Sequence, residues 1–123
     1  MIIYRYEHEN GFGPFTFENY LTELTDEQQE LIEMIGNNLD FSIHPTPKRN
    51  LYMGFGGFGR FFFGCESKEE ILLWFSDDIR YMFNICGFEL KAYDCPDEYC
   101  VRDQNQIGFI KEFAKDITDC VLV

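Results

Sequence analysis

A glycine-rich tract in the middle of the chain carries the first residues whose spacing suggests a chemistry. Gly54, Gly56 and Gly59, in the segment GFGGFG, match the pattern G-x-G-x-x-G that cradles the pyrophosphate of a dinucleotide. That chemistry needs a strand before the glycines and a helix N-terminus directly after them. Here the strand-like run RFFFG follows, and a helix is expected only from Ser67. This context argues against a Rossmann turn.

A basic and aromatic segment surrounds these glycines. Residues 41–65 contain no Asp or Glu, although 22 acidic and 10 basic residues give the chain a formal net charge of −12. Guanidinium groups fork onto phosphates, glycine backbones let N–H groups approach an anion, and aromatic rings stack on bases. Either a nucleotide-type ligand binds here, or a hairpin lies here whose basic residues pair with acids elsewhere. The ligand-binding candidates are Arg5, His44, Lys48, Arg49 and Arg60.

An acidic segment precedes the basic one. Residues 23–40 contain acids and no Lys or Arg. The net charge argues against direct binding to nucleic acid, because the phosphates would be repelled. The acids either serve solubility or present a face to a basic protein partner, as an imitation of nucleic acid. The partner-binding candidates are Glu23, Asp26, Glu27, Glu30 and Glu33.

The five cysteines and two histidines do not indicate a metal site. Cys95 and Cys100 are one pair, without a C-x-x-C motif and without a second pair, so we expect no bound metal. The odd cysteine count and the lack of a signal-peptide pattern predict free thiols in a reducing cytoplasm. No apolar run approaches the roughly 18 residues that span a membrane. The sequence leaves the oligomeric state open, and also whether Cys95 and Cys100 meet in space.

The strands that would position these residues follow from alternating patterns. Alternation predicts strands over residues 2–9, with Ile3, Arg5 and Glu7 on one face, and over 88–94. The run RFFFG (60–64) is strand-like, and a further strand is expected over 106–110. CPDEYC (95–100) is expected to be a turn, and residues 111–123 a short helix followed by a strand.

Capping signals predict the helices. A helix over 25–36 has Thr25 and Gln28 as a capping box, and a helix over 65–75 has Ser67 as its cap with Glu70. A third helix begins after Ser76 or Asp77 and ends at Gly87. We therefore expect a small single α+β domain over residues 1–123, with a mixed or antiparallel sheet and about three helices.

Five blocks of the sequence resemble, in the same order, those of a widespread family of small phage and prophage proteins. The blocks are IYRYEHENGFGPF, HPTP, FFFGCESKEEILLWF, CGFELKAYD and QIGFI. The chain departs from that family's pattern in an acidic helical insertion over residues 20–40 and in the tail beyond Glu112. The resemblance implies a phage-encoded protein in the cytoplasm of the host cell. It supplies no activity.

A second resemblance is to the three motifs of ADP-ribosyltransferases. Arg5 on the first strand, Ser67 before a helix and Gln106 on a late strand follow the order of those motifs. The resemblance implies an ADP-ribosyltransferase-like fold, an NAD or ADP-ribose-like ligand and these three residues as catalytic candidates. Gln106 stands where the family carries a Glu, which puts transfer in doubt and leaves binding. In the alternative interpretation Arg5 pairs with Glu7 or Asp94, and Ser67 is only a helix cap.

Three functions follow from these observations. The favoured hypothesis is a phage accessory protein that counters host defence as an acidic inhibitor of a host protein, like an anti-CRISPR or a nuclease inhibitor. The first alternative is a protein that sequesters a nucleotide or ADP-ribose-type signal. The second is an NAD-dependent ADP-ribosyltransferase-like enzyme, although the sequence leans away from an enzyme. None of the three requires a membrane or direct contact with nucleic acid.

Overall fold

The computed structural model of the protein describes residues 1–9, 11, 24–37, 61–103 and 106–121. Helices and strands alternate irregularly along this part of the chain, and the strands pair in an antiparallel manner, so the α+β class expected from the sequence is confirmed. The elements are β1 (Ile2–His8), α1 (Asp26–Asn37), β2 (Phe61–Gly64), α2 (Lys68–Trp74), α3 (Asp77–Ile85), β3 (Phe88–Asp94), β4 (Cys100–Asp103), β5 (Gln106–Ile110), β6 (Lys115–Asp116) and α4 (Thr118–Val121), with short 3-10 helices at Asp97–Tyr99 and Lys111–Phe113.

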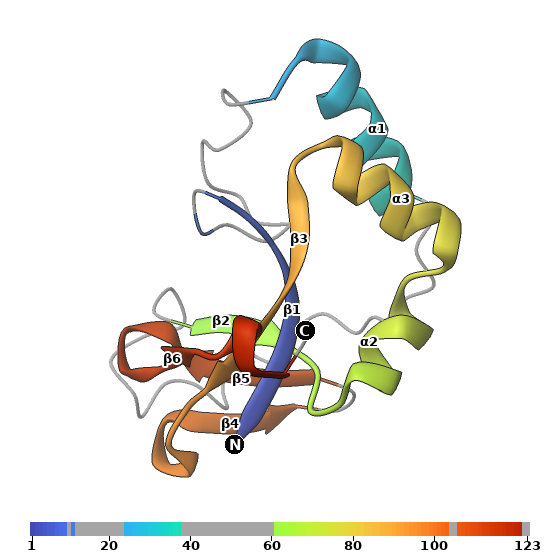
Figure 1. Ribbon diagram of the computed structural model, residues 1–123. Coiled ribbons are helices and arrows are strands. Elements are labelled where there is room, and N and C mark those ends of the chain that lie inside the picture. Colours follow the sequence, from blue (N-terminus) through green and yellow to red (C-terminus); the bar gives the residue numbers. More distant parts are fainter. Residues whose placement is uncertain (10, 12–23, 38–60, 104–105, 122–123) are drawn as a thin grey trace.

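The strands form two small sheets. The first has the order β1-β3-β6 and the second β2-β5-β4. β1 pairs with β3 along its whole length, from Ile2 opposite Asp94 to His8 opposite Phe88. In Figure 1 these two strands run side by side from the second sheet towards α1 and α3. The long β1–β3 ribbon therefore connects the helical end of the molecule to the second sheet.

One backbone pair links the two sheets. Tyr4 of β1 and Cys65, which follows β2, exchange two hydrogen bonds of 2.8 Å. Gly64 makes this approach possible, because a Cβ atom at this position would lie 2.4 Å from the carbonyl oxygen of Tyr4. The absence of a side chain at Gly64 therefore sets how closely β1 approaches β2.

The capping box predicted for α1 is confirmed. The backbone N–H of Gln28 donates to Oγ1 of Thr25 at 3.2 Å, and the N–H of Thr25 donates to Oε1 of Gln28 at 3.0 Å. The Gln28 amide also donates to the carbonyl of Ile85 at the end of α3, at 3.0 Å. The same side chain therefore caps α1 and attaches it to α3.

The caps of the next two helices are serines. Oγ of Ser67 accepts the N–H of Glu70 at 3.1 Å, and Oγ of Ser76 accepts the N–H of Ile79 at 3.4 Å. Of the two predicted caps of α3, Ser76 is therefore the one used. Gly87 ends the turn after α3 with a φ of +88°, a conformation that glycine adopts without strain. No helix in the part of the chain that the structure describes is long and apolar enough to cross a membrane.

Two hydrophobic clusters lie on opposite sides of the β1–β3 ribbon. The cluster under the helices is rich in aromatic rings, and Phe75 and Phe83 meet edge to face at 4.9 Å between centroids. The second cluster fills the space between the two sheets, and it contains Ile3, Tyr93, Cys95, Ile107 and Phe109. β1 contributes to both, so each of its faces packs against a hydrophobic cluster beyond the exposed Ile2.

The chain departs from the predicted elements near its C-terminal end. The segment CPDEYC, expected to be a turn, contains a 3-10 helix and already begins β4 at Cys100. In the tail the expected short helix and strand are present as a 3-10 helix and β6. The helix α4 follows them and was not anticipated.

Candidate functional site

Two charged side chains of β1 point into the space between the sheets. Arg5 and Glu7 are each only 4% exposed, on the same face as the fully buried Ile3. The alternation predicted from the sequence is therefore correct, and this face is internal. Charged residues are rarely buried unless they are paired. The partners of Arg5 and Glu7 therefore define the candidate site.

The Glu7 carboxylate lies at the centre of this cluster. The Tyr93 hydroxyl donates to Oε2, and the Lys111 ammonium donates to Oε1. Nε of Arg5 lies 3.5 Å from the same Oε1, in ion-pair contact. Lys111 also donates to the carbonyl oxygen of Gly11 at 3.3 Å. One carboxylate therefore faces two cations, and we call Arg5, Glu7, Tyr93 and Lys111 the charged cluster.

Aromatic rings cover the other sides of the two cations. The guanidinium carbon of Arg5 and Nζ of Lys111 each lie 5.0 Å from the centre of the Phe62 ring. Nζ of Lys111 also lies 5.4 Å from the centre of the Tyr93 ring. The negative face of each ring attracts the cation, and this contact strengthens where water is excluded.

Burial shifts the pKa values of Arg5 and Tyr93. Burial lowers the pKa of Arg5, and the neighbouring Glu7 acts against that shift. The guanidinium nevertheless stays charged, because its ordinary pKa is so high. Burial also raises the pKa of Tyr93, and its hydrogen bond to Glu7 adds to the effect. Tyr93 is therefore a neutral donor at neutral pH, and the cluster holds two positive charges against one carboxylate.

The contacts expected of Arg5 and Ser67 in the structural interpretation are both present. Arg5 pairs with Glu7, one of the two acids proposed for it, and Ser67 accepts the N–H of Glu70 as the cap of α2. The catalytic roles of these residues stay predictions.

Gln106, the third catalytic candidate, begins β5 and is only 4% exposed. It lies opposite Asp103 of β4, which is also buried. The backbone bonds between Tyr4 and Cys65 place β1 beside the start of this sheet. β1, which carries Arg5, is therefore linked to β5, which carries Gln106, through β2.

The remaining ligand-binding candidates lie outside the described residues. These are His44, Lys48, Arg49 and Arg60, together with the glycine tract over 54–59. Glu23, one of the partner-binding candidates, lies outside them as well. All of these assignments stay predictions.

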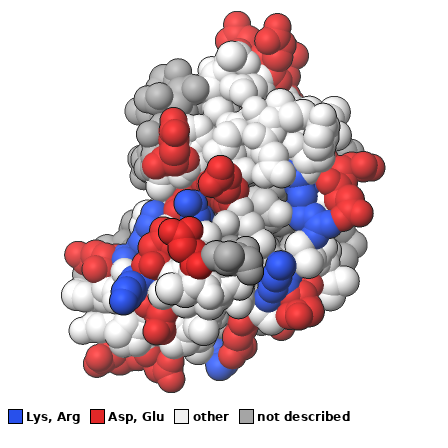
Figure 2. Space-filling model, viewed as in Figure 1, with Lys and Arg blue, Asp and Glu red and all other residues white. Residues whose placement is uncertain are grey.

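The acidic face of α1 is present as predicted. Ile32 and Ile35 are buried towards the other helices, whereas the acids of α1 are exposed. Figure 2 shows Asp and Glu side chains at the upper end of the molecule, over α1, with no Lys or Arg beside them in this view. Within the part of the chain that the structure describes, no ion pair neutralises them. The acidic face consists of Asp26, Glu27, Glu30 and Glu33.

Exposed apolar side chains lie on the same helical end of the molecule. Tyr81 and Ile85, one turn apart on α3, are 68% and 52% exposed, and Met34 of α1 is 47% exposed. α1 and α3 are in contact, as the bond from Gln28 to Ile85 shows. Apolar groups beside charged ones are typical of surfaces that bind another protein.

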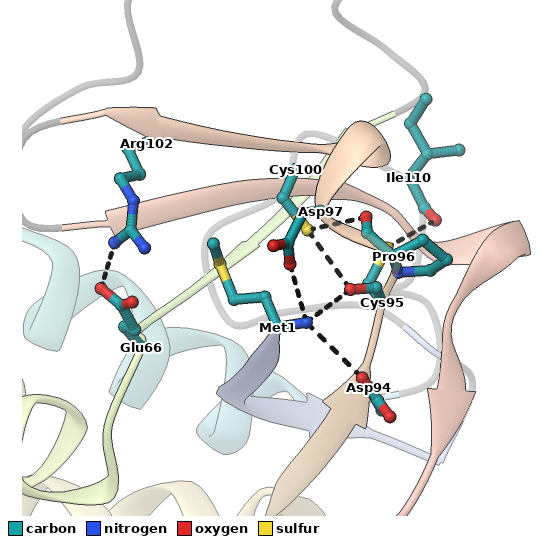
Figure 3. A network of polar contacts seen from close by, with 9 residues as sticks. All are labelled: Met1, Glu66, Asp94, Cys95, Pro96, Asp97, Cys100, Arg102 and Ile110. Atoms are coloured by element: carbon teal, nitrogen blue, oxygen red, sulfur yellow. Dashed lines mark hydrogen bonds and ion pairs between the residues drawn. The ribbon is translucent and has the colours of Figure 1, made fainter.

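Cys95 and Cys100 meet at the turn before β4, as free thiols (Figure 3). The Cys100 thiol contacts the carbonyl oxygens of Pro96, at 3.4 Å, and of Cys95, at 3.8 Å. Burial raises the pKa of Cys100 to about 12, so its thiol stays protonated and is a poor metal ligand or nucleophile. The described residues contain no group of three or more side chains arranged to hold a metal ion.

Three members of the charged cluster were not among the site residues proposed from the sequence. Glu7 had a signal, because alternation put it on the face of Arg5. Tyr93 and Lys111 had none, since they lie 86 and 104 positions from Glu7. Only the pairing of β1 with β3 and the path of the chain after β5 bring them to it.

Comparison with known proteins gives one match. No curated protein and no solved structure matches the chain. The family model described as Bacteriophage T4 Y00F protein matches residues 1–122. The match includes the N-terminal block IYRYEHENGFGPF, which contributes Arg5, Glu7 and Gly11 to the surroundings of the charged cluster. The chain therefore belongs to the Bacteriophage T4 Y00F protein family and is a phage protein.

Proposed function

We propose that this phage accessory protein counters host defence by binding a host protein that handles nucleic acid, such as a CRISPR effector or a nuclease. The acidic face of α1 would occupy the channel that normally receives the phosphates. The observation that carries this proposal is a row of exposed carboxylates on one helix, without a cation on that helix.

The spacing of the acidic face matches that of a nucleic-acid strand. Asp26 and Glu33 are seven residues apart, so they are separated by about 10 Å along the helix axis. Four carboxylates over this length give one charge per roughly 3.5 Å. Along one strand of DNA there is one phosphate per about 3.4 Å. A channel that fits a strand would therefore meet a similar charge density on α1.

The acidic face is also available to a partner. Its carboxylates are exposed, and none of them forms an ion pair with another of the described residues. Tyr81, Ile85 and Met34 lie on the adjoining surface and would supply the contact area that charges alone do not give. The partner would thus combine a basic channel with an apolar rim.

The test is inhibition of nucleic-acid cleavage. Purified protein is added to a panel of CRISPR effectors and host nucleases, and cleavage of a labelled DNA is measured. We expect at least one enzyme to be inhibited, and inhibition to be lost in the variant Asp26→Asn, Glu27→Gln, Glu30→Gln, Glu33→Gln. The changes keep side-chain size and helix propensity nearly constant.

A matched control separates local from overall charge. The variant Glu9→Gln, Glu69→Gln, Glu98→Gln, Asp119→Asn removes the same charge from exposed positions elsewhere. We expect it to inhibit like the unchanged protein. Equal loss of inhibition in both variants would show that net charge and not α1 is responsible. Inhibition of none of the enzymes would refute the proposed function.

A further inference from the structure

We infer that the charged cluster binds the singly charged oxyanion group of a small ligand, a carboxylate or a phosphodiester, between Arg5 and Lys111. This site is separate from the acidic face of α1. The inference rests on the charge balance of the cluster, on the hydrogen bonding of Arg5 and on the exposure of Lys111.

Among the described residues, Glu7 is the one carboxylate in ion-pair contact with Arg5 and Lys111, and Asp116 acts on Lys111 from beyond that distance. Arg5 and Lys111 both face a single oxygen of Glu7, and Tyr93 is a neutral donor there. A buried cation without a partner is costly, because the surrounding protein replaces water poorly. A singly charged anion beside the two cations would complete the balance.

The hydrogen bonding of Arg5 points to the same place. Its Nε atom is buried and forms no hydrogen bond, since the carboxylate of Glu7 lies in ion-pair contact only, at 3.5 Å. The residue is only 4% exposed, so water does not substitute freely. The guanidinium is a planar fork that suits an oxyanion with two oxygens. An oxyanion at Arg5 would supply the missing acceptor.

Lys111 gives the ligand a way in. Its side chain is 24% exposed, whereas that of Glu7 is 4% exposed, so Lys111 forms the outer edge of the cluster. The ammonium is held by Glu7 and by the carbonyl of Gly11 and has a third proton to donate. The Phe62 ring, which touches both cations, is only partly buried. An oxyanion that approaches past Lys111 would contact both cations, and a planar group attached to it could lie against Phe62.

Thermal unfolding of the full chain tests this inference. The probes are sodium acetate, inorganic phosphate, ADP-ribose and a cyclic dinucleotide, each compared with sodium chloride at equal ionic strength. A ligand that binds the folded state raises the melting temperature with concentration. We expect a rise with at least one probe, and titration calorimetry then gives its dissociation constant.

Matched variants assign the binding to the cluster. Lys111→Gln is expected to weaken binding by about tenfold, because a charge-assisted hydrogen bond is lost, whereas Lys111→Arg keeps the charge and the affinity. Lys115→Gln, an exposed neighbour, is the control and should bind like the unchanged chain. Circular dichroism verifies that each variant is folded. Arg5→Lys serves as a second test, at the buried end of the charged cluster.

Each possible result supports or overturns oxyanion binding at the charged cluster. Binding of acetate and phosphate as tightly as of the nucleotides identifies a simple oxyanion site. Binding of ADP-ribose or the dinucleotide alone identifies a nucleotide ligand. No rise with any probe, or an unchanged affinity in Lys111→Gln, overturns the inference. The α1 variant should bind the probe normally, so failure here is distinct from failure of the proposed function.

Discussion

Glu7 and Lys111 meet across 104 positions of sequence, at the place where the two sheets join. Glu7 belongs to β1 of the first sheet, and Lys111 follows directly after β5 of the second. Tyr93, on the neighbouring strand β3, donates to the same carboxylate. This contact adds a polar link to the backbone bonds between Tyr4 and Cys65, so the two sheets are held together at two points.

Replacing Glu7 tests the importance of this link for stability. Glu7→Gln removes the one carboxylate of the described residues that is in ion-pair contact with Arg5 and Lys111, and removal of one partner from a buried ion pair costs about 3–5 kcal/mol. Urea denaturation should show this loss in the free energy of unfolding. Glu89→Gln, on the exposed side of β3, is the control and should change it by less than about 1 kcal/mol. An equally small loss of stability in Glu7→Gln and Glu89→Gln would show that the charged cluster does not stabilise the fold.

Gly64 should not tolerate a side chain. In Gly64→Ala the new Cβ would lie 2.4 Å from the Tyr4 carbonyl oxygen and 2.7 Å from Cγ2 of Ile3. β1 and β2 would have to separate, at a cost of roughly 1–3 kcal/mol for overpacking. Hydrogen exchange should become faster at the amides of Tyr4 and Cys65. Unchanged protection of these amides would show that the link between the sheets does not depend on Gly64.

Ser67 can be tested as a cap and as a catalytic residue at once. Ser67→Ala should lower the free energy of unfolding by about 1 kcal/mol, because the N–H of Glu70 loses its acceptor. Ser67→Asp should restore it, since aspartate also caps helices. Incubation with NAD and host lysate gives the second readout. NAD consumption that both substitutions abolish would show that Ser67 does more than cap α2.

Alkaline pH should destabilise the protein through its buried thiols. Burial raises the pKa of Cys65 from 9.0 to about 12, so the folded state keeps a proton that the unfolded state has lost. The free energy of unfolding should therefore fall as pH rises from about 9 to about 12, by up to about 1.4 kcal/mol per pH unit for each such thiol. Below this window the thiol is protonated in both states and has no effect on the pH dependence.

The variant Cys65→Ala isolates this contribution. It should be less stable than the unchanged chain near neutral pH, because it leaves a small cavity, yet lose less stability on the way to high pH. Urea denaturation at two pH values, about 8 and about 10, spans the start of the window. An equal loss in both proteins would exclude Cys65 as a source of the pH dependence.

The sequence predicted those parts of the fold that depend on local interactions. Thr25 with Gln28, Ser67 and Ser76 cap their helices as expected, because a cap needs only residues within one turn. Alternation predicted β1 and β3, since side-chain direction repeats every two residues. β4 was not predicted because Cys100 follows a proline-containing segment that is typical of a turn. Its pairing with β5 also depends on tertiary structure, which local sequence does not indicate.

The charged cluster could not be predicted in the same way. Arg5 and Glu7 form one half of it and lie on one face of β1, which the alternation showed. Whether that face is buried depends on the second sheet, and Lys111 reaches Glu7 only through the pairing of β5 with β2 and β4. The acidic face of α1 was predictable, because charge and helical period are both local properties.

The central claim is that the acidic face of α1 binds a basic channel of a host enzyme. The salt dependence of this binding tests the claim most directly. The dissociation constant for the inhibited enzyme is measured from about 0.01 M to about 0.15 M salt, where the screening length falls from about 30 Å to about 8 Å. We expect affinity to fall by at least about tenfold over this range, because carboxylates on α1 meet a basic channel. The variant Asp26→Asn, Glu27→Gln, Glu30→Gln, Glu33→Gln should bind weakly at every salt concentration. Tight binding by that variant, with the same salt dependence as the unchanged protein, would contradict the claim.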